Sequence, residues 1–216
     1  NENIINGRIR GVAGVVGCDN PKMGSGSYHV ALVKELIKND VLVVQTGCAA
    51  IECAKEGLLT PEAAIEMAGD GLKEVCKAVG IPPALHCGAC VDNSRILIAC
   101  CNMVAEGGIG KGIDELPVAG AAIEWMAEKA MAIGWYFVAS GALVVFGTPL
   151  RVTGSPQVTQ YITSEIENIV GGKWAFEDNP IKAAHIMIDH IDKKRKALKL
   201  EQMKYAQPYA ECSYSK

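Results

Sequence analysis

The stretch Gly11–Gly17, GVAGVVG, decides the fold of this 216-residue chain. It is an apolar run without alternating polar residues, which is typical of a strand covered on both faces. The next segment, Ser27 to Lys38, has apolar side chains at helical spacing, and Val41–Val44 is again short and apolar. A buried strand, a helix and a second buried strand in this order indicate a βαβ unit with parallel strands.

The same alternation continues along the rest of the chain. We expect further strands over residues 84–86 and 142–146, and helices over residues 60–79, 93–104, 123–138, 158–170 and 180–198. These elements predict an α/β fold with a Rossmann-like, doubly wound, mostly parallel sheet and flanking helices. Residues 1–200 are expected to form one domain, and residues 201–216, which show no clear pattern, a C-terminal tail.

Composition excludes several classes of partner. Half of the residues are hydrophobic but only 6% are aromatic, and the formal net charge is −3 with a pI near 5.9. A chain of this charge has no long-range attraction for nucleic acids or acidic membranes. The first ten residues contain no apolar signal segment, so we expect a cytoplasmic protein. Because the sequence begins with Asn1 rather than Met, we expect it to be part of a longer polypeptide.

One uncharged stretch, Ala130 to Leu150, has the length of a membrane span. However, Ser140-Gly141 divides it into a helix-like half and a strand-like half, and Lys129 and Arg151 bracket it closely. We therefore expect buried core in this stretch and no membrane span.

The chain contains nine cysteines, an odd number at irregular spacing, in a protein too large to need disulfide staples. Metal binding or redox chemistry explains them better than a secreted framework does. Cys18, Cys48 and Cys90 each follow a predicted strand, with a glycine one or two residues before them. Ligands of doubly wound sheets bind beyond the carboxyl ends of the strands, so we expect the three thiolates to converge on one metal–sulfur centre.

Other interpretations of the cysteines remain open. Cys18, Cys48 and Cys90 could be buried structural residues, and Cys87-x-x-Cys90 could be a redox pair or half of a zinc site. The remaining cysteines are predicted to pack in the core on apolar helix faces (Cys53, Cys76, Cys100, Cys101) or to lie in the tail (Cys212).

Phosphate-binding motifs are incomplete. The GxGxxG pattern that begins at Gly24 has His29 in place of its third glycine. The P-loop pattern around Lys111 has Ala105 and Gly112 where a glycine and a Ser or Thr are needed. We therefore expect no nucleotide phosphate site.

Among the histidines, His86 precedes the Cys87–Cys90 cluster and is a candidate for orienting a ligand or carrying a proton; a purely structural role for it is an equal alternative. His185 and His190 are five residues apart on one predicted helix, so they point to different faces and do not form a ligand pair. His29 lies in the helix after the first cysteine and has no assigned role.

Lys129 is a charged residue on an otherwise apolar predicted helix. A lysine in this position often places its ammonium group at the surface. If the ammonium group faces the thiolates instead, it can stabilise negative charge on a substrate oxygen or move a proton.

The motifs GVVGCDNPK, VVQTGCAA, GACVDNSR and AEKAMAIG occur in this order, and with them the chain resembles the C-terminal domain of the nickel–iron–sulfur carbon monoxide dehydrogenases of the prismane superfamily. The resemblance runs from about Gly11 to Leu198. It implies reversible oxidation of carbon monoxide with water to carbon dioxide, two electrons and two protons at a nickel–iron–sulfur cluster of the Ni-4Fe-4S type.

By this resemblance, Cys18, Cys48 and Cys90 are cluster ligands, Lys129 steadies the carboxylate formed from carbon monoxide and water, and Ile133 is an apolar wall beside the nickel. Cys87 stands where the family usually has a non-cysteine residue, so both Cys87 and Cys90 are candidate ligands. We favour Cys90 because VDNSR follows it.

The resemblance also implies what lies outside this sequence. The family has an N-terminal region with further 4Fe-4S clusters and a middle domain with other ligands of the active centre. Its members form homodimers, use a ferredoxin-like electron acceptor, and in some cases associate with acetyl-CoA synthase. The alternatives are a domain of a hybrid cluster protein, which reduces hydroxylamine or nitric oxide, and a non-catalytic module that holds a metal cluster.

Overall fold

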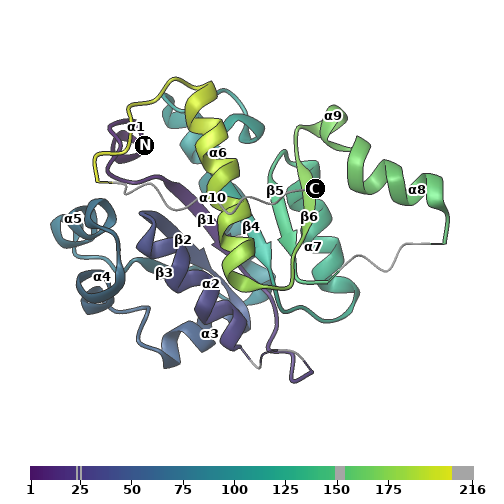
Figure 1. Ribbon diagram of the computed structural model, residues 1–216, viewed down its shortest axis with the longest axis horizontal. Coiled ribbons are helices and arrows are strands. Elements are labelled where there is room, and N and C mark those ends of the chain that lie inside the picture. The colour runs from purple at the N-terminus through teal and green to yellow at the C-terminus, as the bar shows by residue number, and fades with distance from the viewer. Residues whose placement is uncertain (23, 25, 149–153, 206–216) are drawn as a thin grey trace.

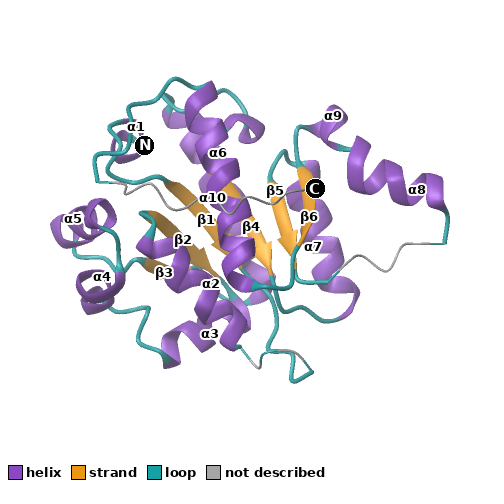
Figure 2. Cartoon of the chain, viewed as in Figure 1, coloured by secondary structure: helices purple, strands orange, loops and turns teal. Residues whose placement is uncertain are grey.

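The computed structural model describes residues 1–22, 24, 26–148 and 154–205 of the chain. Its centre is a single sheet of six parallel strands in the order β3-β2-β1-β4-β5-β6 (Figure 2). The strands are β1 (Gly11–Val15), β2 (Val41–Gln45), β3 (Ala84–His86), β4 (Val118–Ala122), β5 (Leu143–Phe146) and β6 (Lys173–Phe176). This order reverses between β1 and β4, as in a doubly wound sheet, and confirms the predicted Rossmann-like α/β fold.

The helices alternate with the strands along the chain (Figure 1). They are α1 (Glu2–Ile5), α2 (Ser27–Lys38), α3 (Gly47–Lys55), α4 (Pro61–Met67), α5 (Asp70–Val79), α6 (Asn93–Glu106), α7 (Ala127–Ala139), α8 (Pro156–Gln160), α9 (Glu167–Val170) and α10 (Pro180–Ala197). Two short 3₁₀ turns, η1 (Cys90–Asp92) and η2 (Ile113–Glu115), and a π-helical segment, η3 (Tyr161–Glu165), complete the description.

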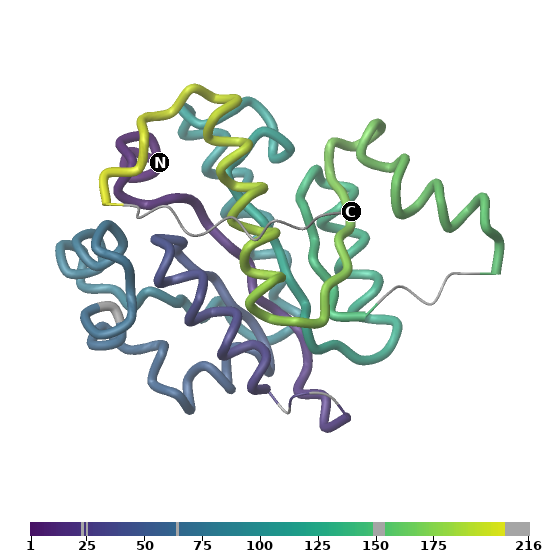
Figure 3. Tube along the Cα trace, viewed as in Figure 1, coloured from purple at the N-terminus to yellow at the C-terminus, as the bar shows by residue number. Residues whose placement is uncertain are grey.

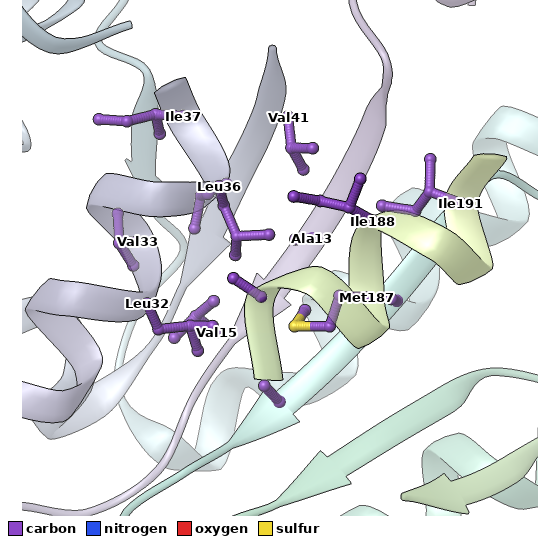
Figure 4. Close-up of a cluster of buried hydrophobic side chains, with 14 of the residues drawn as sticks. Ala13, Val15, Leu32, Val33, Leu36, Ile37, Val41, Met187, Ile188 and Ile191 are labelled. Carbon is purple, nitrogen blue, oxygen red and sulfur yellow. The ribbon is translucent and has the colours of Figure 1, made fainter. Parts of the chain in front are cut away.

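One face of the sheet is covered by α2 and α10, which pack against each other in front of the strands (Figures 1 and 3). The contact is a layer of fully buried aliphatic side chains, in which Leu36 of α2 and Ile188 of α10 meet Ala13 and Val15 of β1 (Figure 4). Burial of each such side chain stabilises the fold by about 1.5–3 kcal/mol. We call this the closed face.

The opposite face is covered by α6 and α7. Because side chains alternate along a strand, Val12 and Gly14 of β1 point to this face, where they line a cavity together with residues of α6 and α7. Val12 and Gly14 remain half-buried, whereas Ala13 and Val15 are fully buried on the closed face. We call this second side the open face.

Several elements differ from the sequence-based prediction. The strands β4 and β6 were not predicted, and the helix expected from residue 123 begins only at Ala127. The sequence VAGAA of β4 lacks the β-branched and aromatic density of a typical strand, and KWAF of β6 is short and begins with lysine. The helical region 60–79 is divided into α4 and α5, because Ala68 and Gly69 are extended.

The uncharged stretch from Ala130 is divided between α7, which ends at Ala139, and the buried strand β5. Within the described residues, no helix is long and apolar enough to cross a membrane. The predicted buried core is found in residues 141–147, whereas in α7 only Gly134 and Val138 are buried and the rest of the helix is half-buried or exposed.

The first residues of the expected tail are attached to the body of the chain. The backbone N–H of Glu201 donates to the carbonyl of Ile5, and the N–H of Lys204 donates to the carbonyl of Gly7. The buried Arg195 guanidinium donates to the carbonyls of Ile4 and Glu201, which ties the two ends together. Residues 206–216, and with them Cys212, lie outside the described residues.

Candidate metal centre

The three strand-end cysteines lie at the carboxyl ends of neighbouring strands. Cys18 follows β1, Cys48 is the second residue of α3 after β2, and Cys90 begins η1 after β3. Since β1, β2 and β3 are adjacent in the sheet, the three turns meet at one edge. The predicted placement of these residues after successive strands is thus confirmed.

The three thiols interact electrostatically. Burial raises the pKa of the half-buried Cys18 thiol above its ordinary value, and the charges of Cys48 and Cys90 raise it further. The backbone N–H of Met126, hydrogen-bonded to Cys18, and the ammonium group of Lys129 act in the opposite direction. A shared thiolate site has this property, because like charges oppose ionisation and a nearby cation favours it.

Lys129 lies directly in this site. Its Nζ atom is 3.1 Å from Cys90 Sγ, with the ammonium group as the donor. The first turn of α7 therefore directs the lysine toward the thiols, although its side chain remains exposed in this chain. The sequence left open whether this residue was a surface lysine or a site residue, and the geometry favours the second interpretation.

The turns that carry Cys48 and Cys90 are fastened to each other. The N–H of Gly47 donates to the carbonyl of Gly88 at 3.0 Å, and the Thr46 hydroxyl is hydrogen-bonded to the Asn93 side chain, both residues being buried. Gly47 has a φ of +61°, and a Cβ atom there would lie 3.1 Å from Cys90 Cβ. Glycine is therefore needed at this position both for its backbone conformation and for the close approach.

Next to the thiols, the open face contains an apolar cavity of about 130 Å³ between α6 and α7. Cys18, Cys90, Lys129 and the half-buried Ile133 all line it. The remaining walls are aliphatic and aromatic side chains of the sheet, α6 and α7. The structure thus brings four of the five predicted site residues to one cavity, with Cys48 at the adjoining edge.

The type and spacing of the possible ligands indicate which kind of metal group this site can hold. Within the described residues, no three His, Cys, Asp or Glu side chains are close enough to hold a single metal ion. A zinc ion would need its sulfur ligands about 2.3 Å away, and so within about 4 Å of one another. Thiolates at the edge of three strands instead fit a larger iron–sulfur group, which its cysteines hold from several sides.

Cys87 and Cys90 occupy different environments. The N–H of Cys87 donates to the Gln45 carbonyl at 2.7 Å, which extends the pairing of β3 with β2, and its own carbonyl accepts from Arg95. Cys90 is exposed at the site edge and contacts Lys129. This difference favours Cys90 over Cys87 as the ligand.

The other cysteines follow the prediction only in part. Cys53 and Cys76 are buried in the core, where burial raises the pKa of each thiol to about 11. Cys100 is half-buried and lines the cavity. The core placement predicted for Cys101 is wrong, because this residue lies on the outward side of α6 and is exposed.

Two functional candidates were missed or left unassigned by sequence reasoning. His29 is fully buried, and its Nε2 atom is 2.9 Å from the Cys18 carbonyl oxygen. Glu124 is also fully buried, beside the Cys18 turn. An acidic residue inside the apolar stretch AAIEWM was a signal that could have drawn attention to it.

The other histidines make contacts of their own or are buried. His86 is exposed, and its Nδ1 atom accepts from the N–H of Gly88. His185 pairs with Glu35 at 3.3 Å, whereas His190 is buried. These contacts provide no metal-ligand role for any of the three.

A sequence model of the Prismane/CO dehydrogenase family matches residues 1–181 of the chain. The chain belongs to the prismane/CO dehydrogenase family. Among curated relatives in this family, carbon monoxide dehydrogenase 1 of Methanosarcina mazei is 54% identical over 197 residues, which cover 91% of this chain. Carbon monoxide dehydrogenase 2 of Carboxydothermus hydrogenoformans is 38% identical over 207 residues, or 92% of this chain.

Solved structures of family members have the same fold. A nickel-free carbon monoxide dehydrogenase from Thermococcus sp. AM4 superposes with a TM-score of 0.88 and 48% identity, covering 93% of this chain and 31% of that chain. Carbon monoxide dehydrogenase IV from Carboxydothermus hydrogenoformans gives a TM-score of 0.87 at 44% identity and covers 92% of this chain and 32% of that chain. The chain spans about a third of the length of the relatives that it matches, 31% in Methanosarcina mazei and 32% in Carboxydothermus hydrogenoformans.

Proposed function

We propose that this chain is the part of a carbon monoxide dehydrogenase that supplies three cluster thiolates, a lysine and one wall of the substrate pocket. The reaction is the oxidation of carbon monoxide with water to carbon dioxide, two electrons and two protons. The single observation that carries the proposal is the contact of Lys129 Nζ with Cys90 Sγ at the rim of an apolar cavity. Relatives named carbon monoxide dehydrogenase support it over the hybrid cluster protein alternative.

The residues present fit a nickel–iron–sulfur cluster, with Cys18, Cys48 and Cys90 as its ligands from this chain. Cys48 and Cys90 are exposed in this chain. Their thiols are therefore accessible to a cluster that also has ligands from another part of the polypeptide. When bound, such a cluster binds carbon monoxide, activates water and accepts the two electrons. The remaining ligands come from residues outside this chain.

Lys129 supplies positive charge where negative charge develops. Its ammonium group already interacts with a thiol, and a substrate in the neighbouring cavity would lie within its field. Such a fixed cation stabilises the carboxylate that forms from carbon monoxide and water, and it does so without reorganisation during the reaction.

Ile133 has a different role, because it contributes apolar surface one helical turn after Lys129. It lines the cavity with other aliphatic and aromatic side chains, which leave few polar atoms for water to bind. The wall therefore excludes water from the pocket and strengthens the electrostatic effect of Lys129. A small apolar gas such as carbon monoxide enters this environment without loss of hydrogen bonds.

The proposal extends to the protein as a whole. Residues 1–200 form the cluster-binding domain of a larger cytoplasmic subunit, and residues 201–216 form its tail. That subunit carries further 4Fe-4S clusters, passes electrons to a ferredoxin-like acceptor and acts as a homodimer. An acetyl-CoA synthase partner is a further part of the proposal, supported by a solved relative described as acetyl-CoA synthase/carbon monoxide dehydrogenase, which matches with a TM-score of 0.84 at 33% identity.

The test uses the complete polypeptide that contains residues 1–216, produced without oxygen in the presence of nickel and iron. We expect reduction of a viologen dye that depends on carbon monoxide. The 216-residue chain alone, treated in the same way, should show no such activity because it lacks several ligands. A metal-loaded complete polypeptide that reduces hydroxylamine but not the dye would support the hybrid cluster alternative, and one with neither activity would support a non-catalytic module.

A further inference from the structure

The turn that carries Cys18 is held from both sides by residues that have no part in the proposed chemistry. The N–H of Cys18 donates to the backbone carbonyl of Glu124 at 2.9 Å. On the other side of the same residue, His29 Nε2 lies 2.9 Å from the Cys18 carbonyl oxygen. A carbonyl oxygen can only accept, so this nitrogen carries the proton and donates.

The Glu124 side chain extends this hold to α2. Its buried carboxylate accepts hydrogen bonds from the N–H groups of Gly26 at 3.0 Å, Tyr28 at 3.3 Å and Asn20 at 3.2 Å. The N-cap residue of α2 is Gly26, which has no side-chain oxygen of its own. A carboxylate from a distant segment therefore caps this helix, where the helix dipole favours negative charge, and it binds the end of the Cys18 turn at the same time.

The Cys18 turn also fits closely between Glu124 and His29. Gly17 has a φ of +136°, and a Cβ atom there would collide with the Glu124 carbonyl oxygen and lie 2.9 Å from His29 Cε1. On the far side of Cys18, the Asn20 side chain donates to the Trp125 carbonyl at 3.3 Å. Both ends of the turn are thus attached to the segment around Glu124.

The same segment leads directly to Lys129. Two residues after Glu124, the N–H of Met126 is hydrogen-bonded to Cys18, and α7 begins at Ala127. A single short segment therefore determines both where the Cys18 sulfur lies and where the helix that carries the lysine starts.

We propose that Glu124 and His29 are positioning residues of the metal centre, which hold the Cys18 turn in its ligating conformation at a set distance from Lys129. The effect of these residues on a metal cluster rests on the proposed function. The effect of the two residues on the conformation of the Cys18 turn can be measured in the absence of metal. Neither residue lines the cavity beside the thiols.

The first experiment follows the thiols of the metal-free complete polypeptide by iodoacetamide labelling and mass spectrometry. Glu124→Gln removes the charge and one acceptor, and His29→Leu removes the donor to the Cys18 carbonyl. We expect both to increase the labelling rate of Cys18 severalfold relative to that of Cys48. His29→Gln, which retains a terminal N–H donor, should restore the wild-type ratio.

The second experiment measures iron and nickel per chain and the electron paramagnetic resonance spectrum after reconstitution. Loss of a group that orients a ligand typically costs about 10- to 100-fold in metal affinity, so Glu124→Gln and His29→Leu should lower metal content and alter the spectrum. The matched controls are Glu106→Gln, at the exposed end of α6, and His185→Gln, on α10. Both should behave as the wild type in each assay.

The outcomes separate the two proposals. An unchanged Cys18-to-Cys48 labelling ratio in His29→Leu overturns the positioning role, even if that variant is less stable. If Glu124→Gln fails to fold, the His29→Leu and His29→Gln pair decides. A wild-type polypeptide without a cluster or dye reduction contradicts the proposed function, while the labelling ratio still reports on the turn.

Discussion

The closed and open faces of the sheet differ in how completely they are filled. On the closed face, α2 and α10 pack against β1 through fully buried aliphatic side chains. On the open face, α6 and α7 leave a cavity of about 130 Å³ that reaches the thiols and Lys129. Both faces are formed by alternate residues of the same strands. The closed face contributes a tightly packed core, whereas the open face contains the cavity beside the thiols.

The largest expected effect concerns Lys129 on the open face. We expect Lys129→Met, in the metal-loaded complete polypeptide, to lower kcat for carbon monoxide oxidation by about 100-fold, as is typical for loss of one group that stabilises developing charge. Because this side chain is exposed in the chain, stability should change by less than about 0.5 kcal/mol.

Lys193→Met, on the surface of α10, is the matched control for Lys129→Met and should leave kcat unchanged. Dye-reduction kinetics and thermal denaturation measure the two quantities separately. A large loss of stability in Lys129→Met would place this residue in the scaffold rather than in the site.

The next effect tests the closed face. Leu36 is fully buried, and Leu36→Ala should lower the free energy of unfolding by about 2–5 kcal/mol. Ile98 on α6 is 57% exposed, so Ile98→Ala should cost less than about 0.5 kcal/mol. Urea denaturation of the two variants gives the comparison, and equal costs would contradict the tight packing of Leu36 on the closed face.

A smaller effect compares two glycines of β1. A Cβ atom on Gly11 would collide with the Pro117 carbonyl and lie 2.7 Å from Ile191 of α10, whereas one on Gly14 would meet only Ile96 of α6 at 3.7 Å. We therefore expect Gly11→Ala to destabilise the fold by about 1–3 kcal/mol. Gly14→Ala should be close to neutral in the same urea titration, and a reversed order would show that the cavity is filled.

The last effect is the dependence of stability on pH. Burial lowers the pKa of His190 from its ordinary value to about 3, and the nearby lysines contribute in the same direction. The unfolded chain then binds a proton at higher pH than the folded chain does, so stability should fall as pH decreases from about 6.5 toward 3. His190→Leu should reduce this slope in urea midpoints at pH 7 and pH 5, and an identical slope would exclude His190 as its source.

Much of the fold could be predicted because the hydrophobic patterns of single strands and helices lie within short stretches of sequence. The apolar runs of β1, β2 and β5 and the helical spacing of α2 and α10 follow from burial on one or both faces. The strands β4 and β6 could not be predicted, because small or mixed side chains enter a sheet only when neighbouring strands pair with them. Val118–Ala122 lies between β1 and β5, where tertiary pairing overrides weak propensity.

The sequence by itself determined the parallel α/β fold and the position of Cys18, Cys48 and Cys90 after successive strands. Those properties depend on periodicity and on the order of elements, which a linear pattern records. Only the tertiary structure decided that Lys129 faces Cys90, that Cys101 is exposed, and that Glu124 and His29 enclose the Cys18 turn. Those contacts join residues up to 106 positions apart (Cys18 and Glu124), and no local pattern specifies which distant backbone group a buried polar side chain will meet.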